Sequence, residues 1–132
     1  MQSFVDALIQ EIELQKSYIK EPIETIYFGG GSPSLLSPQQ LHRIFEAIHR
    51  NFNTQNCVEI TLEANPEDIN PTNLQHWKAL GINRLSLGIQ SLNNNELQWM
   101  NRAHTAEQSL QAVELCTTAG FHNLSIDLIY GS

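Results

Sequence analysis

Two hydrophobic periodicities alternate along the chain, one typical of α-helices and the other typical of β-strands. Apolar residues spaced three and four positions apart predict a helix over residues 3–19 with one apolar stripe. A short run rich in β-branched and aromatic residues then predicts a strand over residues 23–28. Three later segments alternate apolar with polar residues, and they predict strands over residues 57–64, 84–91 and 124–130.

Capping signals predict a helix in each connection between these strands. Ser37 and Asn70 are suitable N-cap residues, and each is followed by a proline, which fits the first helical position. The last connection holds a short helical piece around residues 96–100 and a longer helix over residues 105–120. The resulting order, α-β-α-β-α-β-α-β, is typical of parallel strands joined by right-handed helical crossovers.

The two faces of the predicted sheet differ in polarity. Along residues 84–91, leucine and isoleucine alternate with Ser86, Gly88 and Gln90. Central strands of a doubly wound open sheet are usually apolar on both faces, so the polar face favours the interior of a (β/α) barrel with a ligand at its mouth. A complete barrel takes about 250 residues. We therefore expect a truncated, partial (β/α) barrel of the α/β class, with residues 1–132 forming a fragment of a single core domain.

Composition and charge exclude several classes of partner. The chain has 132 residues, of which 41% are hydrophobic, and this fits one ordinary soluble domain. The net charge of -7, without a basic cluster, makes nucleic acid and anionic membranes poor partners. We find no apolar run of about 18 residues and no signal peptide, so we expect a cytoplasmic protein without a transmembrane segment.

The sequence offers no metal site of its own. Its two cysteines, Cys57 and Cys116, lack the spacing of a metal-binding motif. We expect both to be buried and unreactive, Cys57 at the start of a strand and Cys116 within a helix. An iron–sulfur cluster is normally held by several thiolates, so this chain alone supplies no cluster ligands. His42 and His49 share a face of the second helix, which fits a solvated surface better than a metal site.

The predicted strands end in residues that can bind a ligand. In parallel α/β proteins, ligands bind at the carboxyl ends of the strands. The candidates there, with one residue from the loop after the third strand, are Gly29, Gly30, Gly31, Ser32, Glu63, Gln90, Arg102 and Asp127. Singly, Glu63 could cap a helix, Gln90 could bond a neighbouring strand and Asp127 could pair with a lysine. Their common position on one rim favours a shared site.

The chemical groups on this rim suit a nucleoside that carries an amino-acid tail. Glycine amides can approach a ligand closely, because no Cβ stands in the way. Carboxylates accept hydrogen bonds from ribose hydroxyls, and Arg102 can pair with a carboxylate or a phosphate. His104 could line the same mouth, but we expect it at the surface. The sequence contains no Ser-His-Asp order, HExxH motif or Walker-type lysine, so no catalytic residue is assigned.

Five segments of the chain resemble successive motifs of one known family, in the right order and spacing. They are Phe-Gly-Gly-Gly-Ser-Pro-Ser at 28–34, Leu-Glu-Ala-Asn-Pro at 62–66, Asn-Arg-Leu-Ser-Leu-Gly-Ile-Gln-Ser at 83–91, Asn-Arg-Ala-His at 101–104 and Ser-Ile-Asp-Leu-Ile-Tyr-Gly at 125–131. The family is that of the radical S-adenosylmethionine (SAM) proteins of the oxygen-independent coproporphyrinogen III oxidase type. Arg102 and His104 make the chain more similar to the haem-chaperone-like branch than to the true oxidases.

This resemblance implies a partial (β/α) barrel that binds SAM and a [4Fe–4S] cluster. Reductive cleavage of SAM gives a 5′-deoxyadenosyl radical, with which true oxidases decarboxylate two propionates of coproporphyrinogen III. By the motifs, Gly30, Gly31 and Ser32 would bind the methionyl amino group and Glu63 the ribose. The remaining SAM contacts would come from Gln90, Asp127 and Arg102, the last as partner of the methionine carboxylate. Ser32 stands where the family often has threonine, and the hydroxyl is retained.

Two family features are absent from the sequence, the CxxxCxxC cluster loop and the leucine-proline pair after the last Tyr-Gly. We therefore expect the cluster to belong to the longer parent protein and this chain alone to be inactive. We expect the parent to be an oxidoreductase of porphyrin biosynthesis, with a haem chaperone that binds and transfers haem without oxidase activity as the alternative. A sugar- or nucleotide-phosphate barrel is a third alternative, but no phosphate-binding glycines follow the late strands. Open strand edges also predict self-association.

Overall fold

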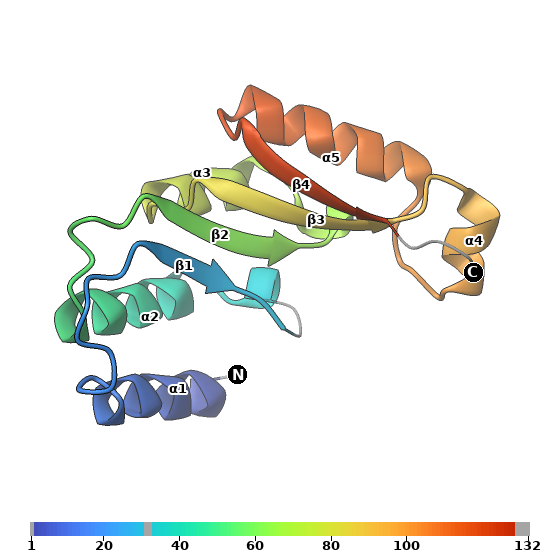
Figure 1. Ribbon diagram of the computed structural model, residues 1–132. Helices are drawn as coiled ribbons and strands as arrows, with labels where there is room; N and C mark the ends of the chain where they lie inside the picture. Colours follow the sequence, from blue (N-terminus) through green and yellow to red (C-terminus); the bar gives the residue numbers. More distant parts are fainter. Residues whose placement is uncertain (1, 31–32, 129–132) are drawn as a thin grey trace.

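The computed structural model of the chain describes residues 2–30 and 33–128 (Figure 1). Its centre is a four-stranded parallel sheet with the order β1-β2-β3-β4. The strands are β1 (Thr25–Phe28), β2 (Glu59–Ala64), β3 (Arg84–Gln90) and β4 (Asn123–Leu128). Their carboxyl ends lie together on the side of the short helix α4 (Asn94–Trp99). The expected α/β architecture with parallel strands is confirmed.

The longer helices cover one side of this sheet. They are α1 (Gln2–Leu14), α2 (Pro38–Asn51), α3 (Pro71–Ala79) and α5 (Ala106–Thr118), and the 3-10 turns are η1 (Pro33–Leu35) and η2 (Pro66–Asp68). Figure 1 shows α2, α3 and α5 along the outer side of the curved sheet, with α1 beside α2. Two ion pairs, Arg43–Asp6 at 2.7 Å and Arg50–Glu13 at 3.1 Å, join α1 to α2. The predicted N-caps, Ser37 and Asn70, accept hydrogen bonds from the first turns of α2 and α3.

Alternate residues of the strands bury an apolar face beneath these helices. On β2 and β3, Leu62, Leu85 and Leu87 are fully buried. They belong to one core, which also contains Leu41, Ile44, Phe45, Leu74, Trp77, Ala112 and Cys116 from α2, α3 and α5. Full burial of one leucine side chain contributes about 1.5–3 kcal/mol. This face therefore holds the helices to the sheet.

The opposite face of the sheet is polar, as the alternation predicts. The parallel register places Tyr27, Thr61, Arg84 and Asn123 in one row across the strands. The Arg84 guanidinium donates to Thr61 Oγ1 at 3.3 Å and to the Ser125 hydroxyl. These bonds join β2, β3 and β4 through side chains. They lie on the same face as the candidate residues but farther from the carboxyl ends of the strands.

Some element boundaries differ from the predictions. The first helix ends at Leu14 rather than at residue 19, because the chain beyond it buries little apolar surface; Tyr18 is 84% exposed. The first strand begins at Thr25 rather than at residue 23. The fourth strand is described to Leu128, and residues 129 and 130, which we predicted to continue it, lie outside the described residues.

The second strand begins at Glu59, so the prediction that Cys57 starts it is wrong. Val58, expected on the same face as Ile60, is 74% exposed. The side chain of Asn83 explains why β2 starts late. It accepts a hydrogen bond from the Ile60 N–H and donates one to the Val58 carbonyl, each at 2.9 Å. This side chain takes the place of a neighbouring strand at the start of β2.

The two cysteines differ in environment. Cys116 is fully buried on α5, as expected, and burial raises the pKa of its thiol to about 11. Thiols with such a pKa stay protonated at neutral pH and react slowly. Cys57 is only partly buried, so the expectation of burial is wrong for this residue.

The sheet has two outer strands, β1 and β4. On β4, Ile126 and Leu128 are 48% and 45% exposed, although their positions belong to the apolar face. Outer strands present backbone groups that can pair with another chain. Self-association through these edges stays a prediction, which sedimentation velocity tests; a monomer at every concentration would contradict it.

Candidate functional site

Glu63, at the carboxyl end of β2, is held by two hydrogen bonds. The Tyr27 hydroxyl donates to Oε2 at 2.5 Å, and the Gly30 N–H donates to Oε1 at 3.1 Å. The bond to Glu63, followed by partial burial, raises the pKa of Tyr27 above its ordinary value of 10.0. The carboxylate therefore faces the polar side of the sheet. It does not cap a helix, which the sequence alone had left open.

The glycine loop after β1 approaches this carboxylate closely. A Cβ at Gly29 would lie 2.6 Å from Tyr27 Cε1 and 3.1 Å from the Glu63 carboxyl carbon. Gly30 has a φ of +78°, which side chains rarely tolerate. Gly29 thus leaves space for the side chains of Tyr27 and Glu63, whereas Gly30 is favoured by its backbone conformation. Two further predicted residues, Gly31 and Ser32, lie outside the described residues.

Gln90 ends β3 in an unusual conformation. Its φ is +71°, and the pairing of β3 with β4 shifts register between Leu87 and Gln90. The side chain folds back along the strand, so that Nε2 would lie 2.9 Å from a Cβ built on Gly88. Gly88 thus leaves space for the amide of Gln90 on the polar face.

Arg102 reaches the same place from the loop after α4. Its Nη2 donates to Asn65 Oδ1 at 3.0 Å. The backbone turns toward the site at Asn101, whose φ is +58°, and the Arg102 N–H donates to the Leu97 carbonyl of α4 at 2.9 Å. One guanidinium nitrogen is therefore fixed by Asn65, and Arg102 lines the polar face beside Gly88.

The fourth candidate with a described side chain, Asp127, lies on the exposed polar face of β4. Ser86 on β3 donates to its Oδ2 at 3.4 Å. The alternative that Asp127 pairs with a lysine is not seen among the described residues, because none of their salt bridges involves Asp127.

Four of the predicted residues line one polar cavity of about 250 Å³. The lining comprises Glu63, Gln90, Arg102 and Asp127 together with Pro33, Ser34, Ala64, Asn65, Ser86 and Gly88. Gly30 touches this site through its bond to Glu63. Two carboxylates and one guanidinium in a small polar cavity can bind a ligand with hydroxyl, ammonium and carboxylate groups.

Sequence reasoning missed part of this lining. Asn65 is not among the predicted site residues, although a polar residue directly after a strand is itself a signal. Ser34 was also missed; its hydroxyl donates to Asp68 Oδ2 at 2.7 Å and so ties η1 to η2 beside the cavity. His104 was expected at the surface, but it is 2% exposed and does not line the cavity.

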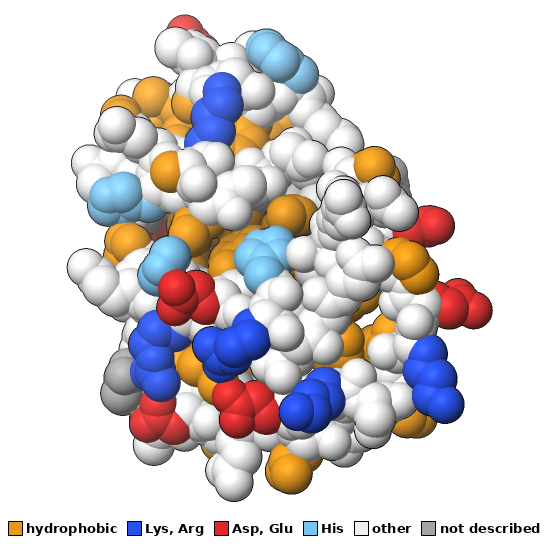
Figure 2. Space-filling model, turned by 90° about the vertical axis from the view of Figure 1, so that its left-hand side faces the viewer, with side chains coloured by type: hydrophobic (Ala, Val, Ile, Leu, Met, Phe, Trp, Pro, Cys, Tyr) orange, Lys and Arg blue, Asp and Glu red, His pale blue; other side chains and the backbone are white. Residues whose placement is uncertain are grey.

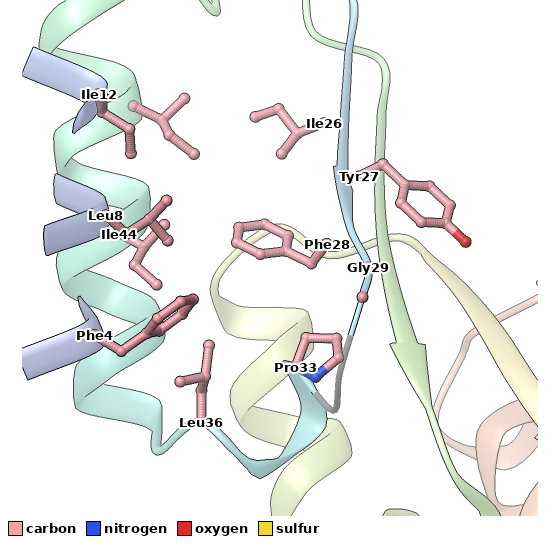
Figure 3. A pocket seen from close by; sticks show the side chains of 12 residues that line it. Phe4, Leu8, Ile12, Ile26, Tyr27, Phe28, Gly29, Pro33, Leu36 and Ile44 are labelled. Atoms are coloured by element: carbon pink, nitrogen blue, oxygen red, sulfur yellow. The ribbon is translucent and has the colours of Figure 1, made fainter. Parts of the chain in front are cut away.

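A second, larger cavity of about 480 Å³ lies on the other face of β1. Figure 3 shows Phe28 of β1 pointing into it toward Leu8 of α1 and Ile44 of α2, whereas Tyr27 points away. Its lining is almost entirely apolar and contains no ionisable side chain apart from Tyr27. This cavity therefore lacks the groups that bind a polar ligand.

The described residues contain neither a cluster of metal-binding side chains nor a membrane-spanning helix. Within residues 2–30 and 33–128, no group of three or more His, Cys, Asp or Glu side chains could hold a metal ion. None of the helices in the same residues is long and apolar enough to cross a membrane. Figure 2 shows the end of the molecule where the strands begin, with Lys and Arg beside Asp and Glu rather than in one basic patch.

Comparison with known proteins agrees with the resemblance found in the motifs. The heme chaperone HemW of Lactococcus lactis subsp. lactis (strain IL1403) is 41% identical over 128 residues, which cover 97% of this chain and 33% of that protein. HemW of Bacillus subtilis (strain 168) is 33% identical over 130 residues, covering 97% of this chain and 34% of that protein. The chain thus spans about a third of the length of these relatives.

Solved structures give the same picture. The coproporphyrinogen III oxidase HemN from Escherichia coli, described as a radical SAM enzyme, matches with a TM-score of 0.88 and 32% identity, covering 98% of this chain and 30% of that one. Archaeal Elp3 from Methanocaldococcus infernus shares the fold at 20% identity, with a TM-score of 0.71. The sequence profile of the Radical SAM superfamily matches residues 5–132. Because that match covers nearly the whole chain, the chain belongs to the radical SAM superfamily.

Proposed function

We propose that the polar cavity at the carboxyl ends of β2, β3 and β4 binds the amino-acid and ribose parts of SAM. The convergence of Glu63, Gln90, Arg102 and Asp127 on one cavity carries this proposal. Superfamily membership implies SAM as a cofactor of the parent protein. The donors and acceptors described above fit this molecule, because it combines ribose hydroxyls with an ammonium and a carboxylate group.

Each residue has a role that follows from its chemistry. The carboxylate of Glu63, held by Tyr27 and Gly30, accepts hydrogen bonds from the ribose hydroxyls. Arg102 pairs with the methionine carboxylate through the N–H groups that Asn65 does not use. Gln90 and Asp127 offer further acceptors. Gly31 and Ser32 complete the proposed contacts to the methionyl amino group from outside the described residues.

The [4Fe–4S] cluster of radical SAM proteins is assigned to the parent and not to residues of this chain. Of its two cysteines, Cys116 lies in the core and Cys57 lies before the start of β2, at the opposite end from the cavity. These residues do not fit a cluster next to the site. When bound in the parent, a cluster supplies the electron that cleaves SAM, and the residues described here serve to bind and orient that molecule.

Equilibrium dialysis with SAM on the full-length protein tests the proposed site. Removing Arg102 deletes a charge-assisted contact, so Arg102→Ala should lower the affinity at least about ten-fold, since such bonds contribute about 1.5–3 kcal/mol. Arg50→Ala is the matched control, because Arg50 pairs with Glu13 of α1 and not with the cavity. Equal affinities for wild type and Arg102→Ala would rule out the proposed carboxylate contact.

For the whole protein, we propose a haem chaperone, since the HemW relatives are 41% and 33% identical and the Arg102-x-His104 pattern points to the same branch. Oxygen-independent coproporphyrinogen III oxidase is the second candidate, supported by the structural similarity to HemN. A haem titration followed by the Soret band, beside an anaerobic decarboxylation assay, separates the two. Haem binding without decarboxylation is expected. Turnover of coproporphyrinogen III would favour the oxidase.

A further inference from the structure

We infer that His104 is a positioning residue that locks together the three segments carrying Asn65, Gln90 and Arg102. The imidazole is buried, with its side chain fully shielded from solvent. It lies in the loop between α4 and α5, directly before the N-cap residue Thr105. The effect of His104 on SAM binding rests on the proposed function. Its effect on the three segments rests on the described contacts alone.

The first contact of His104 is with the end of β3. Its Nε2 lies 2.7 Å from the carbonyl oxygen of Ile89. A carbonyl oxygen only accepts hydrogen bonds, so Nε2 carries the hydrogen and donates it. The same carbonyl also accepts the Ser91 N–H at 2.8 Å. His104 therefore holds the residue immediately before Gln90.

The bond to Ile89 stabilises a strained turn. The Ser91-to-Ile89 bond closes a three-residue γ-turn around Gln90, whose φ is +71°. γ-turns with a positive central φ are rare and strained, and such conformations persist only where their surroundings hold them. This turn folds the Gln90 amide back over Gly88, next to Asn65. The second hydrogen bond to the Ile89 carbonyl thus helps to aim a cavity-lining side chain.

The second contact of His104 is with the segment after β2. Its Nδ1 lies 3.4 Å from Glu67 Oε2. Among the described residues, Nδ1 has no hydrogen-bond partner, so this is a close contact and not a hydrogen bond. Glu67 belongs to η2, two residues after Asn65. The imidazole ring is thus hydrogen-bonded to the backbone of β3 and packs beside the carboxylate of η2.

His104 also fixes its own loop. Arg102 precedes it by two residues, and the Arg102 side chain donates to Asn65. Two side chains of the same loop therefore contact the segment of η2. The guanidinium reaches Asn65, directly before η2, on the cavity side, and the imidazole lies beside η2 on the buried side. Anchoring at His104 limits the positions that Arg102 can occupy. Together these contacts make His104 the common buried neighbour of three cavity-lining segments.

Two variants of the full-length protein separate positioning from simple packing. His104→Phe keeps the volume of a ring and removes both nitrogens. His104→Gln restores an N–H donor for the Ile89 carbonyl. Asn83→Ala is the control, because it deletes two hydrogen bonds from a side chain to the backbone at the opposite end of the sheet. This control shows how a loss of stability alone changes the three segments that line the cavity.

Hydrogen exchange gives a measure that does not depend on the ligand. In His104→Phe, amides of residues 65–69, 89–91 and 101–104 should exchange at least about ten-fold faster, a local loss of about 1.4 kcal/mol. His104→Gln should restore most of the protection. Asn83→Ala, compared at equal global stability, should leave these segments unchanged. Equal rim exchange in His104→Phe and Asn83→Ala would overturn the inference.

SAM binding, measured by equilibrium dialysis, supplies the second readout. His104→Phe should bind about ten-fold more weakly than wild type, with recovery in His104→Gln, because the turn at Gln90 and the Arg102 loop are released. If the wild type binds SAM and His104→Phe binds it equally well, the positioning role fails while the proposed function stands. If the wild type does not bind SAM but rim exchange responds as expected, the proposed function fails and the positioning role stands.

Discussion

Strand β1 separates two cavities of opposite character. The larger one, of about 480 Å³, lies on the side of Phe28 and is lined by apolar side chains of α1 and α2 (Figure 3). The smaller one, of about 250 Å³, lies on the polar face of the sheet, to which Tyr27 points and where Glu63 lines the wall. The larger cavity has no charged group, whereas the smaller one has three. Size alone would select the apolar cavity, whereas the chemistry of the lining favours the polar cavity as the candidate site.

The difference between the two faces follows from the period of a strand. Neighbouring residues of β2, Leu62 and Glu63, point to opposite faces, one into the core and one into the polar cavity. A substitution at Leu62 should therefore change mainly stability, and a substitution at Glu63 should change mainly ligand binding. The predictions below test that separation at single residues.

The largest effect is expected on the apolar face. Leu62→Ala should lower the free energy of unfolding by about 2–5 kcal/mol, because it leaves a cavity in the core. Urea unfolding followed by fluorescence of the buried Trp77 measures this change. SAM affinity of the folded variant should stay within about two-fold of wild type. Val58→Ala is the control, since Val58 is 74% exposed and should change stability by less than about 0.5 kcal/mol.

The opposite result is expected one residue later. Glu63→Gln removes one of the two negative charges from the polar cavity and should weaken SAM binding about ten-fold, with a change in stability below about 1 kcal/mol. Glu59→Gln, on the same face and strand but at its other end, should change neither quantity. A strong loss of stability without a loss of affinity in Glu63→Gln would show that the two faces are not functionally separate.

A smaller effect concerns the hydroxyl that holds Glu63. The raised pKa of Tyr27 means that its neutral form is favoured in the folded state, chiefly by the bond to Glu63. This contribution to stability is therefore complete below the unfolded pKa of 10.0 and is lost as pH rises through the higher folded pKa. Tyr27→Phe should remove this dependence. Urea midpoints of both proteins between about pH 9 and about pH 11 test the sign, and identical pH profiles would contradict it.

The sequence predicted most of the fold because the alternation in β2 and β3 is regular. The two faces, the N-caps and the convergence of Glu63, Gln90, Arg102 and Asp127 all followed from local patterns and from the rule for parallel strand ends. Features set by distant contacts were missed. The late start of β2 depends on the side chain of Asn83, which lies 23 residues beyond its partner Ile60.

His104 shows the same limit at the site. Nothing in its neighbouring sequence predicts burial, because its partners, Ile89 and Glu67, come from two other segments of the chain. The turn at Gln90 was also beyond local reasoning, since glutamine has no preference for a positive φ. Such a conformation is held by the surrounding fold and not by the residue itself.

The alternation along β2 also bears on the fidelity of folding. A slip of one residue between β2 and β3 would place the Glu63 carboxylate in the core and expose Leu62 on the polar face. The uncompensated carboxylate and the lost apolar burial would both penalise the mispaired state. The pattern that builds the polar cavity therefore also discriminates the correct strand pairing from its nearest competitor.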